Sequence, residues 1–314
     1  MRALSRSAAL GLIGGALAAS RPAAAQTAPQ TVRIGATAID ACGEAYYGVD
    51  NGMFASSGIN AQITTLGNGA AIMAGVTSGD LDVGMTNTPQ LAVAISRGIP
   101  LQMIAPASLY SKKDADPNLE VAKDSPIKSA ADLAGATIAV SSLGDFNQLS
   151  VYGWFDANKV AHDRVKFVEL RFGEMGAALQ RGTVQAAILT EPAKTDALRA
   201  GQIRDLADTY IAIAPEIATI VWFASKDWLQ KNPELAKRLV NTIYAIGKWG
   251  NANPALSGPI LAKAAKMDPA VVATLLRRIY ATTNDRRYVE ATLALAARYG
   301  MLQRPVTFED YSAF

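Results

Sequence analysis

The sequence predicts an α/β protein made of two lobes, and three observations support this. One plan of strand, loop, helix, tight turn and buried strand occurs twice along the chain. Both copies end in a polar loop, with a proline at or near the start of the next helix. The roughly 290 residues that follow an expected export signal exceed what one hydrophobic core usually supports. We therefore expect a mixed sheet in each lobe, covered by helices.

The repeat is clearest at its turns. GDLDVGMTNTP over residues 79–89 matches GTVQAAILTEP over residues 182–192, with glycine on glycine and proline on proline at a constant offset of 103 positions. The first strands of the two units, within residues 32–40 and 137–145, both run from apolar residues into hydroxyl residues and end on Asp. This ungapped spacing favours two related α/β units over a chance likeness.

Residues 1–25 have the pattern of an export signal. Arg2 and Arg6 form a basic start, residues 8–19 an apolar centre too short to span a bilayer, and residues 23–25 an A-x-A cleavage site before Gln26. No cysteine occupies the cleavage point, so no lipid anchor is expected. We expect a periplasmic protein that does not span the membrane after cleavage.

The charge balance argues against a polyanionic partner. The chain has 30 basic and 27 acidic residues, and the three arginines of residues 1–25 account for the whole excess. A neutral mature chain gives no support to nucleic-acid or polybasic membrane binding. Cys42 is the only cysteine, which rules out an intramolecular disulfide. A small half-buried loop residue is favoured over a reactive thiol at this position.

Lobe one is expected to comprise residues 31–110 and 215–314. Its first part should contain, in order, a strand from residue 31, a helix over 44–51, a strand over 60–66, a helix over 68–78, a strand over 81–85, a helix over 90–97 and a strand over 101–105. From Trp228 onward the pattern is helical, with helices opening at Pro233 and Pro269. We expect these C-terminal helices to pack on lobe one.

Lobe two is expected to comprise residues 111–214, with hinge crossings near residues 105–120 and 206–224. Ser129 is expected to cap a short helix that ends at Leu133. The other elements should be a strand over 119–122, a strand over 136–140, a helix over 146–158, a strand over 165–170 and the end of the repeated unit near residue 199.

Ligand-binding residues are expected in the loops at the carboxyl ends of the strands. There, helix N-termini offer free N–H groups and a partial positive charge. The candidates are Thr37, Asp40, Asn68, Gly69, Thr86, Asn87, Thr88, Ser141, Ser142, Asp145, Asn147 and Glu191. Each has a local alternative, because such residues also cap helices or satisfy loop backbone. Nearby rings are expected mainly to pack the core or the hinge, namely Tyr46, Phe146, Phe172 and Trp222.

Several short phrases along residues 31–240 occur in a recognisable order. They are VRIG at 32–35, Tyr46 six places before GMF at 52–54, SGDLDVG at 78–84, KDS at 123–125, ADLAG at 131–135 and TEP at 190–192. Together they resemble the periplasmic substrate-binding proteins of ABC importers, in the branch serving nitrate, sulfonates, taurine and thiamine precursors. The resemblance implies a two-lobed clamshell of the type 2 binding-protein fold, which closes on a small-molecule ligand and delivers it to an inner-membrane ABC permease.

The charges in the candidate loops bear on the ligand. Arg171 is the only basic side chain there, whereas Asp40, Asp145 and Glu191 are three acids. If two or more of these acids face the ligand, an organic ligand with a hydrogen-bond donor is favoured over a simple inorganic anion. Asn87→Ala and Ser141→Ala are both expected to weaken binding with little loss of stability.

Two other functions remain open from the sequence. The first is a thiamine-pyrimidine-synthase-like enzyme of the same fold, a branch with a catalytic histidine and a cysteine-rich motif. This chain has one histidine, His162 in a polar loop, and one cysteine, and lacks nucleophile-elbow, zinc-protease and phosphate-loop motifs. We therefore expect no catalytic residue, cofactor or metal, and a monomer. The second is a ligand-sensing adaptor for a membrane receptor, which the sequence does not separate from an importer component.

Overall fold

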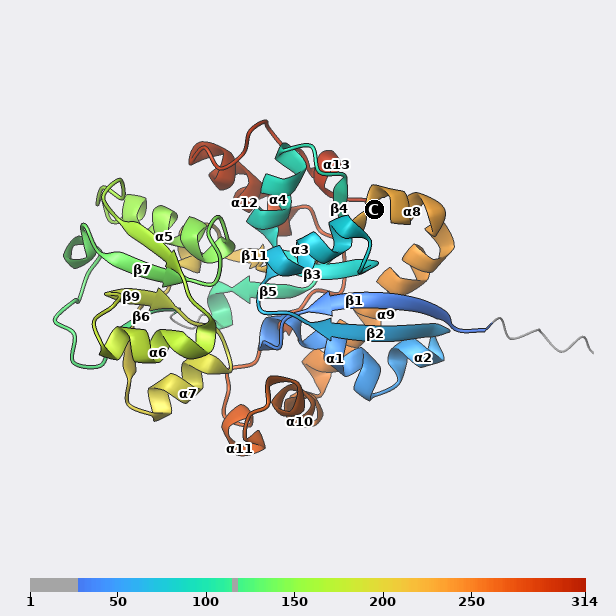
Figure 1. The fold of residues 1–314 in the computed structure, drawn as a ribbon, viewed down its shortest axis with the longest axis horizontal. Helices are drawn as coiled ribbons and strands as arrows, with labels where there is room; N and C mark the ends of the chain where they lie inside the picture. Colours follow the sequence, from blue (N-terminus) through green and yellow to red (C-terminus); the bar gives the residue numbers. More distant parts are fainter. Residues whose placement is uncertain (1–27, 115–117) are drawn as a thin grey trace, which may run out of the picture.

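The computed structural model describes residues 28–114 and 118–314, and contains two five-stranded sheets flanked by helices (Figure 1). The expected export signal, residues 1–25, lies outside the described residues. Within the described ranges, no helix combines the length and the apolar character needed to cross a bilayer.

The first sheet has the strand order β2-β1-β3-β12-β4. Its strands are β1 (Gln30–Ala36), β2 (Ile59–Thr65), β3 (Val83–Asn87), β4 (Leu101–Pro106) and β12 (Ile220–Ser225). Strand β1 pairs in parallel with β2 and β3, whereas β12 pairs antiparallel with β3 and β4. Successive side chains of β12 enter different hydrophobic clusters, Trp222 on one face and Phe223 on the other, and both are fully buried.

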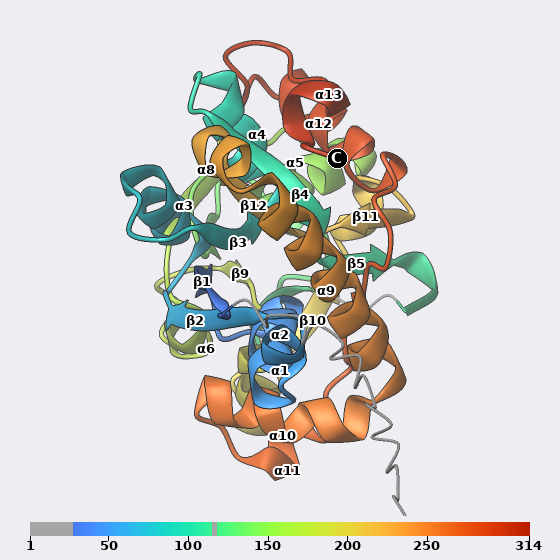
Figure 2. The ribbon, with the colours of Figure 1, turned by 90° about the vertical axis from the view of Figure 1, so that its right-hand side faces the viewer.

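Helices from both ends of the chain cover the first sheet. They are α1 (Gly43–Asp50), α2 (Met53–Ser56), α3 (Gly69–Ser78), α4 (Thr88–Ser96), α8 (Lys226–Lys231), α9 (Pro233–Ala252), α10 (Pro254–Ala265), α11 (Pro269–Val272), α12 (Arg287–Arg298) and α13 (Phe308–Tyr311). Figure 2 shows α10 and α11 at one end of the molecule, α12 and α13 at the other, and α9 between them.

The second sheet has the order β8-β7-β9-β6-β10. Its strands are β6 (Leu119–Ala122), β7 (Thr137–Val140), β8 (Lys166–Glu169), β9 (Ala186–Ile188) and β10 (Ile203–Ala207). The helices of this half are α5 (Phe146–Ala157), α6 (Phe172–Gln180) and α7 (Ala193–Arg199). As β1 does in the first sheet, β7 pairs in parallel with two neighbours, β8 and β9, and β9 has the antiparallel strand β6 on its other side.

The strand registers show that the repeat in the sequence is a repeat in the structure. Ile34 of β1 pairs with Val83 of β3, and Ile138 of β7 pairs with Ala186 of β9. Residue 186 follows residue 83 by 103 positions, the offset of the sequence repeat. The two units therefore bring corresponding loops to the carboxyl ends of corresponding strands.

A third, small sheet lies between the two large ones (Figure 1). It contains β5 (Ser108–Ser111), β11 (Glu216–Ala218) and β13 (Ile279–Tyr280), all antiparallel, with β5 in the centre. Two 3-10 helices, η2 (Lys112–Asp114) and η4 (Tyr210–Ala212), lie close to its strands along the chain. The position of β5 and β11 between the sheets supports the proposed crossings near 105–120 and 206–224, although the lobe boundaries stay a prediction.

Two local expectations are wrong. The short helix η3 (Ala131–Leu133) begins after Ala130 without a side-chain cap. The carboxylate of Asp132 instead accepts the backbone N–H groups of Lys128 and Ser129 and the hydroxyl of Ser129, and so uses the hydroxyl that was expected to cap the helix. The C-terminal tail is also not wholly helical, because it contributes β13, and a two-residue strand is too short to show a sequence period.

Candidate functional site

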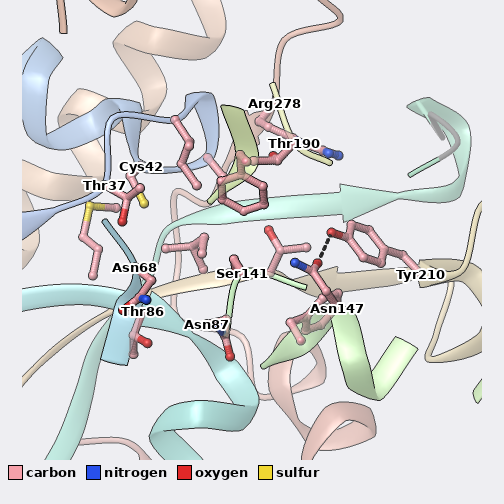
Figure 3. A pocket seen from close by; sticks show the side chains of 18 residues that line it. Thr37, Cys42, Asn68, Thr86, Asn87, Ser141, Asn147, Thr190, Tyr210 and Arg278 are labelled. Atoms are coloured by element: carbon pink, nitrogen blue, oxygen red, sulfur yellow. Dashed lines mark hydrogen bonds between the residues drawn. The ribbon is translucent and has the colours of Figure 1, made fainter. Parts of the chain in front are cut away.

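A small cavity of about 60 Å³ lies where the loops of both large sheets meet (Figure 3). We call it the central pocket. Eighteen residues line it: Thr37, Ile39, Ala41, Cys42, Asn68, Gly69, Met85, Thr86, Asn87, Ser141, Phe146, Asn147, Phe172, Thr190, Tyr210, Thr219, Ile220 and Arg278. They come from both halves of the repeat, from the crossing segments and from the C-terminal tail.

The first half contributes the ends of its strands and the starts of its helices. Thr37 follows β1, and Thr86 and Asn87 end β3. Asn68 caps α3 by accepting the Ala71 N–H at 3.0 Å. Asn87 caps α4 in the same way. The local rules that start these helices therefore also fix their capping side chains at the pocket wall.

The second half contributes corresponding positions with different chemistry. Ser141 follows β7, and Thr190 follows β9. Phe146 and Asn147 open α5, and Phe172 opens α6. These residues place two aromatic rings on the pocket wall, and the sequence had favoured core or hinge packing for both. Figure 3 shows Ser141 and Asn147 near the middle of the site, with Asn68 and Thr86 toward one edge.

Three polar residues from outside the repeat also line the pocket. Tyr210 lies in η4, Thr219 between β11 and β12, and Arg278 directly before β13. The Tyr210 hydroxyl donates to Asn147 Oδ1 at 2.8 Å, and its ring meets Phe146 edge to face. The sequence analysis missed all three, and the only signal for Arg278 was an Arg-Arg pair interrupting a helical tail.

Seven of the predicted binding residues line the central pocket. They are Thr37, Asn68, Gly69, Thr86, Asn87, Ser141 and Asn147. The other five lie behind the wall: Asp40, Thr88, Ser142, Asp145 and Glu191. Contact of any of the twelve with a ligand stays a prediction.

Asp145 serves the local structure of α5. Its Oδ1 accepts the Gln148 N–H at 2.9 Å, which caps the helix, and its Oδ2 accepts the Ser141 hydroxyl at 2.8 Å. Burial raises the pKa of this carboxyl to about 6, against the opposing effect of these hydrogen bonds. Ser142 is turned away as well, because its hydroxyl donates to Glu169.

Asp40, Thr88 and Glu191 also have partners away from the pocket. Asp40 forms a buried ion pair with Arg277. Thr88 donates to the Ala218 carbonyl at 2.7 Å. Glu191 accepts the backbone N–H and the hydroxyl of Thr195 at 3.1 and 2.9 Å. Local structure, the alternative weighed for the whole set, accounts for the side chains of Asp145 and Glu191. The side chains of Asp40, Thr88 and Ser142 instead contact residues distant in the sequence.

The charge of the pocket differs from the sequence-based expectation. None of its lining residues, all within the described ranges, is Asp or Glu, and Arg278 is the one charged side chain among them. Arg171, the expected basic residue, has an 84% exposed side chain and pairs with Glu174. The condition that would disfavour an anion, two or more acids facing the ligand, is not met by these residues.

Hydrogen bonds within the wall determine what it offers a ligand. Ser141 donates its only hydroxyl proton to Asp145, and Thr86 donates its own to Gln90 Oε1 at 3.1 Å. Both oxygens therefore retain only acceptor capacity. Asn68 uses its carbonyl oxygen as a cap and keeps its NH₂ as a donor, and Arg278 is a donor only. The pocket can thus satisfy an anionic group and a hydrogen-bond donor at the same time.

Cys42 also lines the pocket but is poorly suited to nucleophilic chemistry. Burial raises the pKa of its thiol to about 12. Because the thiolate is the nucleophile, such a thiol is inert at neutral pH. Among the described residues, no three His, Cys, Asp or Glu side chains are grouped so as to hold a metal ion.

Comparison with known proteins gives one family match and a curated relative. A family model described as NMT1/THI5 like matches residues 42–255. The taurine-binding periplasmic protein of Escherichia coli (strain K12) is 29% identical over 209 residues, which is 65% of this chain and 62% of that protein. The aligned region thus spans less than two thirds of this relative.

Solved structures share the fold at low identity. The periplasmic aliphatic sulphonate binding protein SsuA from Escherichia coli has a TM-score of 0.73 and 19% identity, with 91% of this chain and 93% of that chain covered. The desulfurization enzyme DSZB has a TM-score of 0.65 and 17% identity, with 90% and 96% covered. At these identities the likeness shows the fold alone, and the fold is found both in a binding protein and in an enzyme.

Proposed function

Because the chain belongs to the NMT1/THI5-like family, we propose that it is the extracytoplasmic solute-binding component of an ABC importer. In this proposal it captures a small organic solute between two lobes in the periplasm and delivers it to a permease in the inner membrane. The family match confirms the resemblance found in the sequence. The solved structures confirm the predicted fold class, the two-lobed α/β fold of the periplasmic binding proteins.

The proposed mechanism is closure of the two halves on the ligand. The central pocket takes its walls from both, and one backbone hydrogen bond, from Asp40 N–H to the Glu191 carbonyl at 3.1 Å, already joins them. A ligand that contacts both walls gains free energy only in the closed arrangement and so shifts the population toward it. The permease would then recognise the closed pair.

We further propose that the ligand is a compact organic anion that also carries a hydrogen-bond donor. The observation that carries this is the pocket lining: one guanidinium, no carboxylate among the described residues, and the two hydroxyl oxygens of Ser141 and Thr86 left as acceptors. The rings of Phe146 and Phe172 suit a short apolar stem. A zwitterion of the aminoalkyl sulfonate or aminoalkyl carboxylate class has all three features.

The size of the pocket limits the ligand further. A cavity of about 60 Å³ has room for roughly four to six water-sized spheres, at about 10–15 Å³ for each. A solute with a handful of non-hydrogen atoms fits this space. The taurine named for one relative is of this size, as is nitrate, but nitrate carries no donor for the two acceptor hydroxyls.

Isothermal titration calorimetry with a matched ligand series tests this proposal on the chain from Gln26 onward. The series is 2-aminoethanesulfonate, ethanesulfonate without the amine, 2-aminoethanol without the sulfonate, nitrate and sulfate. We expect 2-aminoethanesulfonate to bind most tightly, with a roughly 10-fold loss on removing the amine because an acceptor is left unpaired. Tighter binding of 2-aminoethanol, nitrate or sulfate would contradict the proposed ligand class.

We also propose that the chain binds its ligand without altering it. The buried thiol of Cys42, with its raised pKa, supports this, although the shared fold with a desulfurization enzyme makes a direct test worthwhile. Ligand recovered from the denatured complex after prolonged incubation should have an unchanged mass. A product that lacks sulfur or nitrogen would favour the enzyme alternative.

A further inference from the structure

A buried carboxylate behind the pocket wall holds the arginine that lines it. Asp40 has no exposed surface, and its Oδ2 accepts the backbone N–H of Arg278 at 2.6 Å. Its Oδ1 accepts Nε of Arg277 at 2.9 Å, and the two side chains form an ion pair. The loop after β1 is therefore hydrogen-bonded to two successive residues of the C-terminal tail, Arg277 and Arg278.

Two tyrosines complete this cluster. The Tyr280 hydroxyl donates to the Asp40 carbonyl at 2.6 Å and lies 3.3 Å from Oδ1, and the Tyr47 hydroxyl donates to Oδ1 at 3.2 Å. Arg277 also donates to Tyr47 and to the Pro254 carbonyl. A carboxylate has about four acceptor positions, so these donors leave Asp40 little capacity for a ligand.

Asp40 nevertheless lies between two residues that line the pocket. Its chain neighbours Ile39 and Ala41 line the pocket, and its own N–H bonds to the Glu191 carbonyl across the junction of the two halves. Arg278, by contrast, is a lining residue and forms no ion pair in the described part of the chain. Its strand β13 contains only two residues, so pairing with β5 alone would hold it weakly.

We propose that Asp40 is a positioning residue, which fixes the backbone of Arg278 so that this guanidinium meets the anionic group of the ligand. This inference rests on the proposed function, in which Arg278 binds that group. The carboxylate acts through the Arg278 N–H and through Arg277, and does not contact the ligand. Replacing Asp40 should therefore lower the affinity for the ligand only while Arg278 is present.

A double-mutant cycle separates this role from a purely structural one. Calorimetry with ethanesulfonate as the probe is carried out on the wild type, Asp40→Ala, Arg278→Met and the double variant. We expect Asp40→Ala to weaken binding about 10-fold in the wild type and less than about 2-fold in the Arg278→Met background, since residues acting as a unit are not additive. Asp40→Asn keeps an acceptor for the Arg278 N–H and should recover part of the affinity.

A matched control is available in the same half of the molecule. Asp82 also accepts a backbone N–H and a guanidinium, both from Arg33, at 2.7 and 2.6 Å, but it does not line the central pocket. Asp82→Ala should leave ethanesulfonate affinity within about 2-fold of the wild type. If Asp40→Ala does not fold, as judged by circular dichroism, Tyr280→Phe replaces it in the cycle and should give a smaller loss that also disappears without Arg278.

The outcomes distinguish the two levels of the proposal. Normal ethanesulfonate binding by Arg278→Met would refute the anion site itself, and the positioning role with it. Weak binding by Arg278→Met together with fully additive losses in the double variant would refute the positioning role alone. A loss of affinity in Asp82→Ala equal to that in Asp40→Ala would likewise refute it, since an arginine–carboxylate pair away from the pocket would then have the same effect.

Discussion

The two large sheets have the same strand order but present different chemistry to the pocket. Residues 103 positions apart line it from the two halves, Gly69 with Phe172 and Asn87 with Thr190. The first half offers a glycine and a helix-capping amide there, and the second offers a ring and a hydroxyl. The strand plan thus determines where the loops lie, whereas the residues at the helix starts determine what those loops can bind.

The largest expected effect on the free energy of unfolding comes from a difference between the halves that lies behind the pocket. Lys194 of α7 follows Leu91 of α4 by 103 positions, and the two side chains are 3% and 0% exposed. Lys194 Nζ lies 3.3 Å from Asp205 Oδ1 and 3.9 Å from the buried Glu120. Lys194→Ala should lower the free energy of unfolding by about 3–5 kcal/mol, because it removes a buried cation that lies beside a buried carboxylate.

Urea unfolding followed by circular dichroism measures this effect. Lys237→Ala, which breaks an exposed pair with Glu234, serves as the control and should change stability by less than about 1 kcal/mol. A Lys194→Ala change as small as the control would mean that Glu120 is neutral or hydrated. The double replacement Glu120→Gln with Lys194→Met should recover much of the loss, because no charge then stays buried.

The next expected effect is a pH dependence of the free energy of unfolding, caused by one buried acid in each half, Glu44 and Asp145. Burial raises the pKa of Glu44 to about 8, although the Trp222 indole N–H, 2.7 Å from Oε2, opposes the shift. Because the folded pKa exceeds the ordinary value of 4.5, the free energy of unfolding is highest near or below pH 4.5. It should fall by about 4 kcal/mol as pH rises toward 8, at about 1.4 kcal/mol for each unit of pKa shift.

Glu44→Gln should remove most of this pH dependence. Asp145 has the same sign in a narrower window, with its contribution present below pH 3.8 and lost as pH rises through about 6. Chemical unfolding at intervals between pH 5 and 9 compares the wild type with Glu44→Gln, and the exposed Glu174→Gln serves as the control. An unchanged slope in Glu44→Gln would show that this carboxyl titrates normally.

The smallest expected effect compares Asn87 with its counterpart Thr190. Asn87 accepts the Gln90 N–H at 3.1 Å, whereas Thr190 caps no helix. Asn87→Ala should therefore cost about 1 kcal/mol of stability, which revises the sequence-based expectation of little loss. Asn87→Ser should keep the cap but not the amide that lines the pocket, so, if Asn87 contacts the ligand as proposed, calorimetry should show weak binding in a stable protein. Equal losses of stability in Asn87→Ala and Thr190→Ala would remove the distinction.

The repeated elements could be predicted because their signals are local. Gly79 and Gly182 end helices with positive φ, as only glycine does readily, and Asn68 and Asn87 start helices where capping rules place them. The directions in which the acidic side chains point could not be predicted. Asp145 is directed toward Gln148 and Ser141 by contacts that depend on the folded loop, and a sequence does not contain them.

The source of the pocket's charge was beyond sequence reasoning for a different reason. Arg278 reaches the site through a strand of two residues and a carboxylate 238 positions earlier in the chain. Neither has a periodic signature, and the surrounding tail is otherwise helical. Arg171 was more conspicuous because it lies in a repeated loop, yet its side chain is largely in solvent.

The small central sheet places Arg278 next to the proposed hinge. Ile279 and Tyr280 pair with Leu109 and Ser108 of β5, which also pairs with β11. In the proposed hinge of β5 and β11, Arg278 lies next to β13 at the hinge and is also bound through its backbone N–H to Asp40 of the first half. If the halves open and close as proposed, Arg278 should keep its position relative to the loop after β1. Capture of an anion should be a salt-sensitive encounter with a fixed target, and closure a later step that governs how long the anion stays.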